Sequence, residues 1–114
     1  ENILLHNENL AIIDFDNLAF GWFGFDLAGA LWDRIDVSAN GGHFKTAQES
    51  IIEGYLQARP DAQEIIDSIP MFLLVRTLML ISWIDDQPAS SYKHHIPKLI
   101  NASKVQARNL NLVT

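Results

Sequence analysis

Residues 2–16 read Asn2-Ile3-Leu4-Leu5-His6-Asn7-Glu8-Asn9-Leu10-Ala11-Ile12-Ile13-Asp14-Phe15-Asp16. Two short apolar runs, at residues 3–5 and 10–13, flank a polar segment whose two asparagines suit a tight turn. We therefore predict a β-hairpin at the start of the chain. A two-stranded hairpin is only marginally stable on its own, so this one must pack against something else.

An amide and three carboxylates surround this hairpin. Asn2 precedes the first strand, Asp14 and Asp16 follow the second, and Asp26 lies in the downstream run Gly24-Phe25-Asp26-Leu27-Ala28. Asn and Asp side chains offer hard oxygen ligands, which suit Mg²⁺ held against phosphates. Asp14 is the strongest candidate metal ligand, because two such ligands at one end of a hairpin can converge on a single ion. A carboxylate that merely ends a strand is the simpler alternative.

The rest of the chain shows helical periodicity. Ala28, Leu31, Trp32 and Ile35 share one face of a helix that starts near Asp26, which could act as its cap, and ends before residues 38–42. Further helices are predicted around Phe44, Ala47, Ile51, Tyr55 and Leu56 (closed by Pro60), over residues 61–68, from Pro70 through Trp83, and along Leu99, Ala102, Val105 and Leu112. The predicted fold is one mainly α domain with a short N-terminal β-hairpin, spanning residues 1–114.

Composition narrows the class of protein. At 114 residues, 48% of them hydrophobic, the chain can bury the core of one domain. The absence of cysteine excludes disulfides and thiolate metal sites and favours a cytoplasmic location. The net charge of −6 argues against nucleic acid or an anionic membrane as a partner. The apolar stretch at 69–84 contains Pro70 and Arg76, so we predict a central core helix, too short and too interrupted to span a bilayer.

Three segments together resemble a known family. They are Glu1-Asn2-Ile3-Leu4-Leu5, Ile12-Ile13-Asp14-Phe15-Asp16 and Gly21-Trp22-Phe23-Gly24-Phe25-Asp26-Leu27-Ala28. In this order and spacing they are similar to the phosphotransferases that include aminoglycoside phosphotransferases and choline kinases, which are relatives of the protein kinases. The motif-bearing resemblance covers residues 1–32. The remainder fits the family's helical lobe only in a general way.

The resemblance implies a role for each polar residue. Asn2 matches the Asn that follows the family's catalytic His-x-Asp loop, and Asp14 matches the metal-binding Asp. Both would hold Mg²⁺, with Asp16 either reaching the ion through water or lying solvated beside it. Asp26 matches the Asp that supports the catalytic loop through its backbone.

The implied fold is the C-terminal lobe portion of a kinase-like enzyme. The whole enzyme would move the γ-phosphate of ATP or GTP to a hydroxyl of a small molecule. The N-terminal lobe and the His-x-Asp loop with its general base are expected before Glu1, so the chain alone is expected to be inactive. Its exposed hairpin, at Ile3, Leu5, Ile12 and Phe15, is expected to self-associate.

Some of the tryptophans and histidines are candidates either for binding sites or for ordinary structural roles. Trp22 follows the metal motif and is a candidate for the substrate pocket, because the face of a Trp ring binds quaternary ammonium groups. Trp32 and Trp83 lie on apolar helix faces and are predicted to be core residues. His94-His95 is predicted to be a loop pair rather than a zinc site, since adjacent residues do not share a helix face. Arg76 is expected to pair with a buried carboxylate.

Two alternative functions remain open at this stage. The chain could be a non-catalytic helical interaction domain whose acidic residues serve only solubility and capping, and metal binding would separate the two cases. It could also be part of a protein kinase. Asp16 follows Phe15 where protein kinases have Gly, and no Ala-Pro-Glu segment occurs, so the small-molecule enzyme is favoured.

Overall fold

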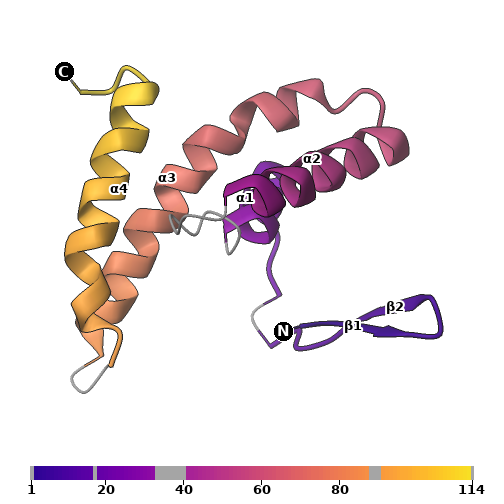
Figure 1. The fold of residues 1–114 in the computed structure, drawn as a ribbon, viewed down its shortest axis with the longest axis horizontal. Coiled ribbons are helices and arrows are strands. Elements are labelled where there is room, and N and C mark those ends of the chain that lie inside the picture. Colours follow the sequence, from indigo (N-terminus) through magenta and orange to yellow (C-terminus); the bar gives the residue numbers. More distant parts are fainter. Residues whose placement is uncertain (1, 17, 33–40, 88–90, 114) are drawn as a thin grey trace.

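The computed structural model describes residues 2–16, 18–32, 41–87 and 91–113, with the backbone alone for 41–45. The elements run in the order β1 (Ile3–His6), β2 (Asn9–Ile12), α1 (Phe23–Trp32), α2 (Gly41–Ala58), α3 (Gln63–Asp86), the 3₁₀ turn η1 (Lys93–His95) and α4 (Ile96–Asn109) (Figure 1). The strands form a two-stranded antiparallel sheet. The prediction of a mainly helical chain with an N-terminal hairpin is confirmed.

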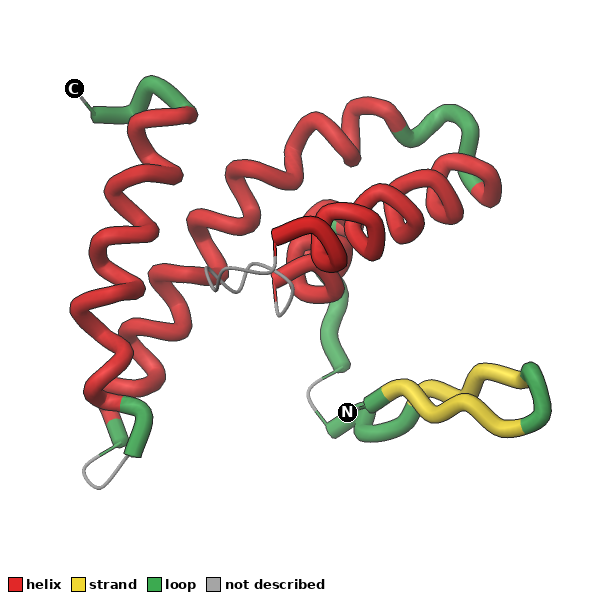
Figure 2. Tube along the Cα trace, in the orientation of Figure 1, coloured by secondary structure: helices red, strands yellow, loops and turns green. Residues whose placement is uncertain are grey.

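The core lies where α1 and α2 meet α3. Leu27 and Leu31 of α1 are buried with Ile69 of α3, and partly buried side chains of α2 and α3 pack against them: Ile51, Ile52, Tyr55, Ile65, Ile66 and Leu73. The hairpin takes no part in this core. Figure 2 shows it lying apart from the helices at the end of an extended linker.

Helices α1 and α3 approach each other closely at Gly24. A Cβ atom at this position would meet the Ser68 hydroxyl and would lie 2.7 Å from the Phe72 ring. Only glycine therefore lets the two helices approach this closely. The Phe72 ring also contacts Trp22 and Phe25, with ring centroids 6.0 and 6.1 Å apart.

A partly buried hydrogen bond joins α1 to α3 further along. The indole nitrogen of Trp32 donates to the hydroxyl of Thr77, at 3.3 Å. Thr77 is 1% exposed and its hydroxyl donates in turn to the carbonyl of Leu73, at 2.9 Å. The polar groups are thus satisfied inside the packed interface. The prediction that Trp32 is a core residue is confirmed only in part, because its side chain is partly buried and lies at the edge of the interface.

The two helices predicted at 61–68 and from Pro70 onward are in fact one. Helix α3 runs unbroken from Gln63 to Asp86 and contains Pro70. A proline inside a helix removes one backbone hydrogen bond and bends the axis without necessarily ending it. Helix α3 curves visibly in Figure 1. Packing of Ile69 against α1 stabilises the continuous helix despite the proline.

The prediction that α3 is a buried core helix is wrong over much of its surface. Its outer stripe stays exposed, comprising Met71, Val75, Leu78, Met79 and Trp83. Trp83, predicted to be a core residue, is 54% exposed. Arg76 is half-buried and lies beside Gly29 of α1. Sequence periodicity could not show this, because a helix that is apolar all round does not reveal which of its faces finds a neighbour.

The 24-residue length of α3 also corrects the prediction that this apolar stretch is too short to span a bilayer. By length and composition, α3 is the one helix in the described part of the chain that could cross a membrane. A single helix of this kind is weak evidence, because core helices of soluble proteins pass the same test.

Helix α4 packs on the C-terminal half of α3 and ends at Asn109, so Leu112 lies beyond it and is exposed.

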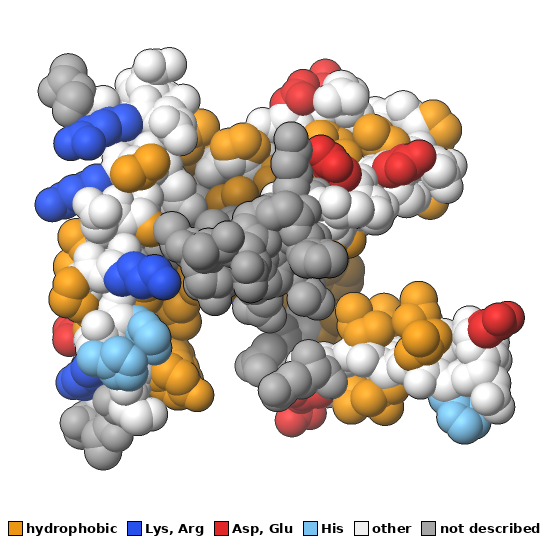
Figure 3. All heavy atoms as spheres, viewed as in Figure 1, with side chains coloured by type: hydrophobic (Ala, Val, Ile, Leu, Met, Phe, Trp, Pro, Cys, Tyr) orange, Lys and Arg blue, Asp and Glu red, His pale blue; other side chains and the backbone are white. Residues whose placement is uncertain are grey.

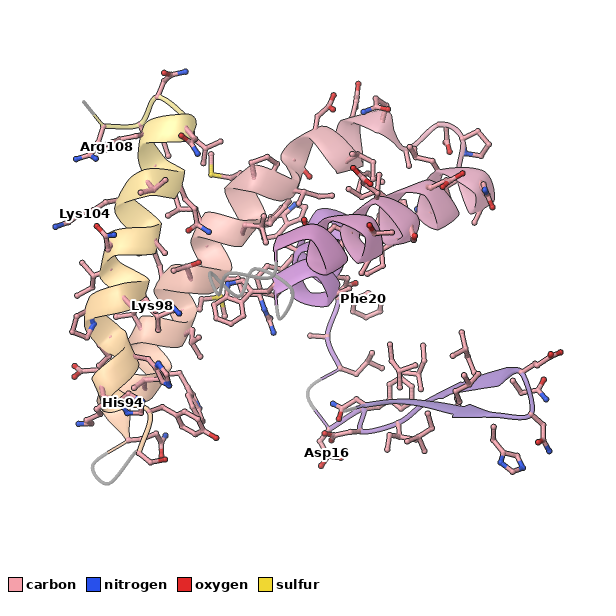
Figure 4. All side chains as sticks on the ribbon, in the orientation of Figure 1. Asp16, Phe20, His94, Lys98, Lys104 and Arg108 are labelled. Carbon is pink, nitrogen blue, oxygen red and sulfur yellow. The ribbon has the colours of Figure 1, made fainter. Side chains whose placement is uncertain are left out.

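Residues 91–114 contain four of the eight Lys and Arg residues and no Asp or Glu. Basic side chains follow α4 in Figure 3, and Figure 4 shows Lys104 and Arg108 pointing away from α3. His94 and His95 lie in η1, with ring centroids 3.9 Å apart, rather than in a loop. The side chains of His94, His95, Lys104 and Arg108 are exposed.

Two helical glycines allow a matched test of this packing. Gly24→Ala should destabilise the protein by about 1–3 kcal/mol, because the new methyl group overlaps Ser68 and Phe72. Gly54→Ala should stabilise it by about 0.5–1 kcal/mol, because Gly54 lies within α2 with nothing within 4 Å of the new methyl group. Urea unfolding followed by circular dichroism would measure both changes. Equal stability of the two variants would contradict the close α1–α3 crossing.

Candidate functional site

The hairpin turn is two residues long. Asn7 and Glu8 both have positive φ angles, 46° and 64°, as the type I′ turn of a tight hairpin requires. The Asn9 side-chain amide donates to the carbonyl of Asn7, at 3.1 Å, which holds the turn closed. The predicted turn at residues 6–9 is confirmed.

This turn fixes the pairing of the strands. His6 lies opposite Asn9, and the register continues through Leu5 opposite Leu10 to Ile3 opposite Ile12. One step further, the backbone N–H of Ile13 donates to the carbonyl of Asn2, at 3.0 Å. The register therefore brings Asn2 to the same end of the hairpin as Asp14.

Asn2 and Asp14 are in direct contact. The side-chain amide of Asn2 donates to one carboxylate oxygen of Asp14, at 3.1 Å. Asp14 has a φ of 66°, a left-handed conformation that is uncommon outside glycine but tolerated by Asp. Such a conformation at the end of β2 redirects the chain and is found frequently at functional sites. Twelve residues apart in sequence, the two predicted metal ligands lie side by side.

The spacing of this pair fits one magnesium ion. Adjacent ligands of an octahedral Mg²⁺ with bonds of about 2.1 Å lie about 3 Å apart. The Asn2 amide can turn over to present its oxygen instead of its nitrogen at the same place, since amide orientation is set by the hydrogen-bond partner. Both residues are exposed, so the ion could also keep waters and bind phosphate oxygens.

Two protein ligands would not complete the coordination of the ion by themselves. Within residues 2–16, 18–32, 46–87 and 91–113, whose side chains the structure describes, no three His, Asp or Glu side chains gather closely enough to hold a metal. A site of two protein oxygens is typical of Mg²⁺ that binds together with substrate phosphates, rather than of a closed structural cage. This geometry suits an ion delivered with a nucleotide.

Asp16 lies beyond the pair. It is exposed and lies in a turn, in which the N–H of Leu18 donates to the carbonyl of Phe15, at 3.0 Å. Figure 4 shows Asp16 at the open end of the hairpin. Contact with a metal through water stays a prediction.

The prediction that Asp26 caps a helix is wrong. Helix α1 begins at Phe23, three residues earlier than expected, and the Phe25 N–H already bonds to the carbonyl of Trp22. Contacts of Trp22, Gly24 and Phe25 with Phe72 extend the helix at its start. Asp26 lies exposed in the first turn, where its charge still suits the helix dipole. Its support of a catalytic loop stays a prediction.

Aromatic side chains fill the linker between Asp16 and α1. Trp22 is 75% exposed although it contacts Phe72, so its placement in a substrate pocket stays a prediction. Phe20 is fully exposed, and the Arg59 guanidinium lies 4.8 Å from the centre of the Phe23 ring. Sequence reasoning overlooked Phe20 and Arg59. The alternation of glycine and aromatic residues at 20–25 was the available signal for Phe20, whereas nothing in the sequence linked Arg59 to Phe23.

Comparison with known protein families finds a match over the first part of the chain. The sequence model of the phosphotransferase enzyme family matches residues 1–64, which is more than half of the chain and contains the hairpin, the linker, α1 and α2. No curated protein and no solved structure matches.

Metal binding at the Asn2–Asp14 pair can be tested on this chain directly. Mn²⁺ should broaden the NMR signals of the Asn2 side-chain amide, and Asp14→Asn should weaken that effect at least about tenfold, because it removes a charged ligand. Asparagine keeps the left-handed backbone accessible. Asp67→Asn on α3 is the control and should change nothing at Asn2. Unchanged broadening in Asp14→Asn would reject the site.

Proposed function

Because this chain belongs to the phosphotransferase enzyme family, we propose that it is the C-terminal-lobe part of a small-molecule kinase. The reaction proposed is transfer of the γ-phosphate of ATP or GTP to a hydroxyl group of a small acceptor. The observation that carries this proposal is the contact between Asn2 and Asp14, at 3.1 Å, inside the segment that matches the family.

Asn2 and Asp14 are proposed to hold Mg²⁺. The ion would bridge phosphate oxygens and offset charge that develops during transfer. The chain's own contribution is positional. The hairpin register holds the amide and the carboxylate together, and the left-handed backbone at Asp14 aims its carboxylate at the amide.

Charge distribution supports a requirement for the metal. All 14 Asp and Glu residues lie within residues 1–90, and Asp14 and Asp16 stand at the proposed phosphate site. Half of the basic residues lie instead on the C-terminal segment, from Lys93 to Arg108. Phosphates approaching the hairpin would meet negative charge, so a divalent cation is needed to offset the repulsion.

No general base is assigned among the residues of this chain. The family resemblance implies a His-x-Asp segment before Asn2, and the helices after Asp26 are proposed to shape the acceptor pocket. We accordingly propose that the 114-residue chain on its own is inactive. Trp22 and Asp16 are proposed to face the acceptor and the metal, respectively.

A non-catalytic interaction domain is the second candidate. The observation that favours it is the amount of exposed apolar surface on the hairpin and on α3. In that case the Asn2–Asp14 contact would serve only to close the end of the hairpin. The two candidates differ in what loss of the Asp14 charge does to phosphoryl transfer.

The proposed activity is tested in the protein expressed from its complete reading frame. With Mg²⁺, ATP or GTP and a panel of hydroxyl compounds, Asp14→Asn should lower kcat about a thousandfold, equivalent to about 4 kcal/mol of transition-state stabilisation. Lys104→Ala, on the outer face of α4, should leave turnover unchanged. Circular dichroism would establish that both variants fold. Turnover like that of the wild type in Asp14→Asn would refute the assignment.

A further inference from the structure

Charge is unevenly distributed along this chain. Residues 1–90 contain all 14 Asp and Glu residues and four Lys and Arg residues, a net charge of −10. Residues 91–114 contain the other four Lys and Arg residues and no Asp or Glu, a net charge of +4. An acidic protein with one basic region presents opposite potentials on different parts of its surface. The two regions therefore attract each other when they belong to different copies.

The basic region forms an exposed face of α4. Four exposed residues fall on this face by helical spacing: Lys98, Lys104, Val105 and Arg108. Figure 4 shows Lys104 and Arg108 pointing away from α3. Val105 lies next to Lys104 and is 47% exposed, so the face combines positive charge with an apolar side chain. We call these four residues the basic face.

Helix α2 carries a shallow groove of the opposite charge. The groove is lined by residues that recur at i, i+3, i+4, i+7 and i+8 on one side of the helix: Glu49, Ile52, Glu53, Leu56 and Gln57. Ile52 and Leu56 are half-buried, whereas both glutamates are exposed. The groove therefore has an apolar floor and two carboxylates at its rim. We call these five residues the acidic groove.

The two surfaces match in spacing as well as in charge. Lys104 and Arg108 are four residues apart on α4. Glu49 and Glu53 have the same separation on α2, so each pair spans about one helical turn, or about 6 Å. Two helices lying side by side can bring both cations to both carboxylates, with Val105 directed toward the apolar floor of the groove. The apolar contact matters, because exposed ion pairs stabilise little by themselves.

The placement of the two surfaces allows two such contacts in one dimer. In Figure 3, basic side chains follow α4 on one side of the visible face, and acidic side chains gather over α2 and the start of α3 on the other side. A two-fold axis in the plane of this face brings α4 of each copy opposite α2 of the other. Both surfaces lie away from the hairpin, beside which the proposed function places further chain.

We propose that two copies of this chain associate across a two-fold axis, with the basic face of each copy in the acidic groove of the other. The proposal rests on charge and spacing and not on phosphoryl transfer. Self-association through the hairpin, which the sequence analysis predicted, stays a separate prediction.

Sedimentation equilibrium of the 114-residue chain measures the association. At low ionic strength, the wild type should approach twice its 12.8 kDa mass as concentration rises. Raising NaCl to about 0.5 M should weaken association at least tenfold, because salt at this concentration screens charges more than a few ångströms apart.

Reversal of charge on each surface identifies the contact. Lys104→Glu with Arg108→Glu should weaken association at least tenfold, and so should Glu49→Lys with Glu53→Lys. An equimolar mixture of these two double variants should regain association, since each contact in the mixed dimer again joins opposite charges. Reversal at Glu49 and Glu53 changes the net charge by +4, from −6 to −2. General repulsion between acidic copies would therefore predict tighter, not weaker, association of that variant.

Asp85→Lys with Asp86→Lys, at the end of α3, is the matched control. It makes the same change of net charge at exposed residues and should not weaken association. Circular dichroism should show unchanged helix content in every variant, because all the substituted side chains are exposed.

Four outcomes would overturn the proposal. They are a wild type that stays monomeric at every concentration, a dimer unaffected by either charge reversal, a mixture of the two reversed variants that stays monomeric, and a mass that keeps rising beyond two copies. The last outcome would show contacts that do not close on a two-fold axis. None of these measurements depends on phosphoryl transfer, so the proposed function stands or falls separately.

Discussion

The two-residue turn at Asn7 and Glu8 sets the geometry on which the candidate site depends. A hairpin whose register slipped by one residue would turn every side chain to the other face. With the observed register, Ile13 pairs with Asn2, and Asn2 comes within hydrogen-bond distance of Asp14. The same register places Ile3, Leu5, Leu10 and Ile12 on the face opposite Asn2. One local constraint therefore determines both the contact between Asn2 and Asp14 and the face on which each strand residue lies.

The helices form a body that is energetically distinct from the hairpin. Its stability comes from the crossing of α1 on α3 at Gly24 and from the core around Leu27, Leu31 and Ile69. Trp32 and Thr77 add a partly buried hydrogen bond to the same interface. Because no described residue of the hairpin belongs to this core, the Asn2–Asp14 site can be changed by mutation without disturbing the packing of the helices.

Local pattern was sufficient to predict the hairpin and the pairing of its ends. The polar turn flanked by apolar runs fixed the strands, and the position of Asn2 and Asp14 at those ends brought them together. Packing between the helices determined the bounds of α1 and α3, which the local pattern did not predict. Phe72 extends α1 upstream of Asp26, and the packing of Ile69 maintains α3 as one helix despite Pro70. No sequence period indicates contacts between residues this far apart.

Trp83 is a residue whose exposure could not be predicted from the sequence. Its apolar surroundings predicted burial, but α1 and α4 cover other faces of α3 and leave this residue exposed. The charge of the C-terminal segment was readable from the sequence as composition, whereas its placement along the outer face of α4 required the structure. Asp16 lies exposed just after the hairpin, whereas Trp22 packs against Phe72 of α3, and neither arrangement fixes the role that the sequence suggested for these residues.

The central claim is that Asn2 and Asp14 act as one ligand pair. A double-mutant cycle on Mn²⁺ affinity tests it most directly, using Asn2→Ala, Asp14→Asn and the double variant. Residues in direct contact that bind the same ion should show a coupling free energy of about 0.5–3 kcal/mol. The double variant should therefore bind Mn²⁺ only slightly less tightly than whichever single variant has the lower affinity. Losses that simply add would contradict the account, because they would show that the amide and the carboxylate act independently.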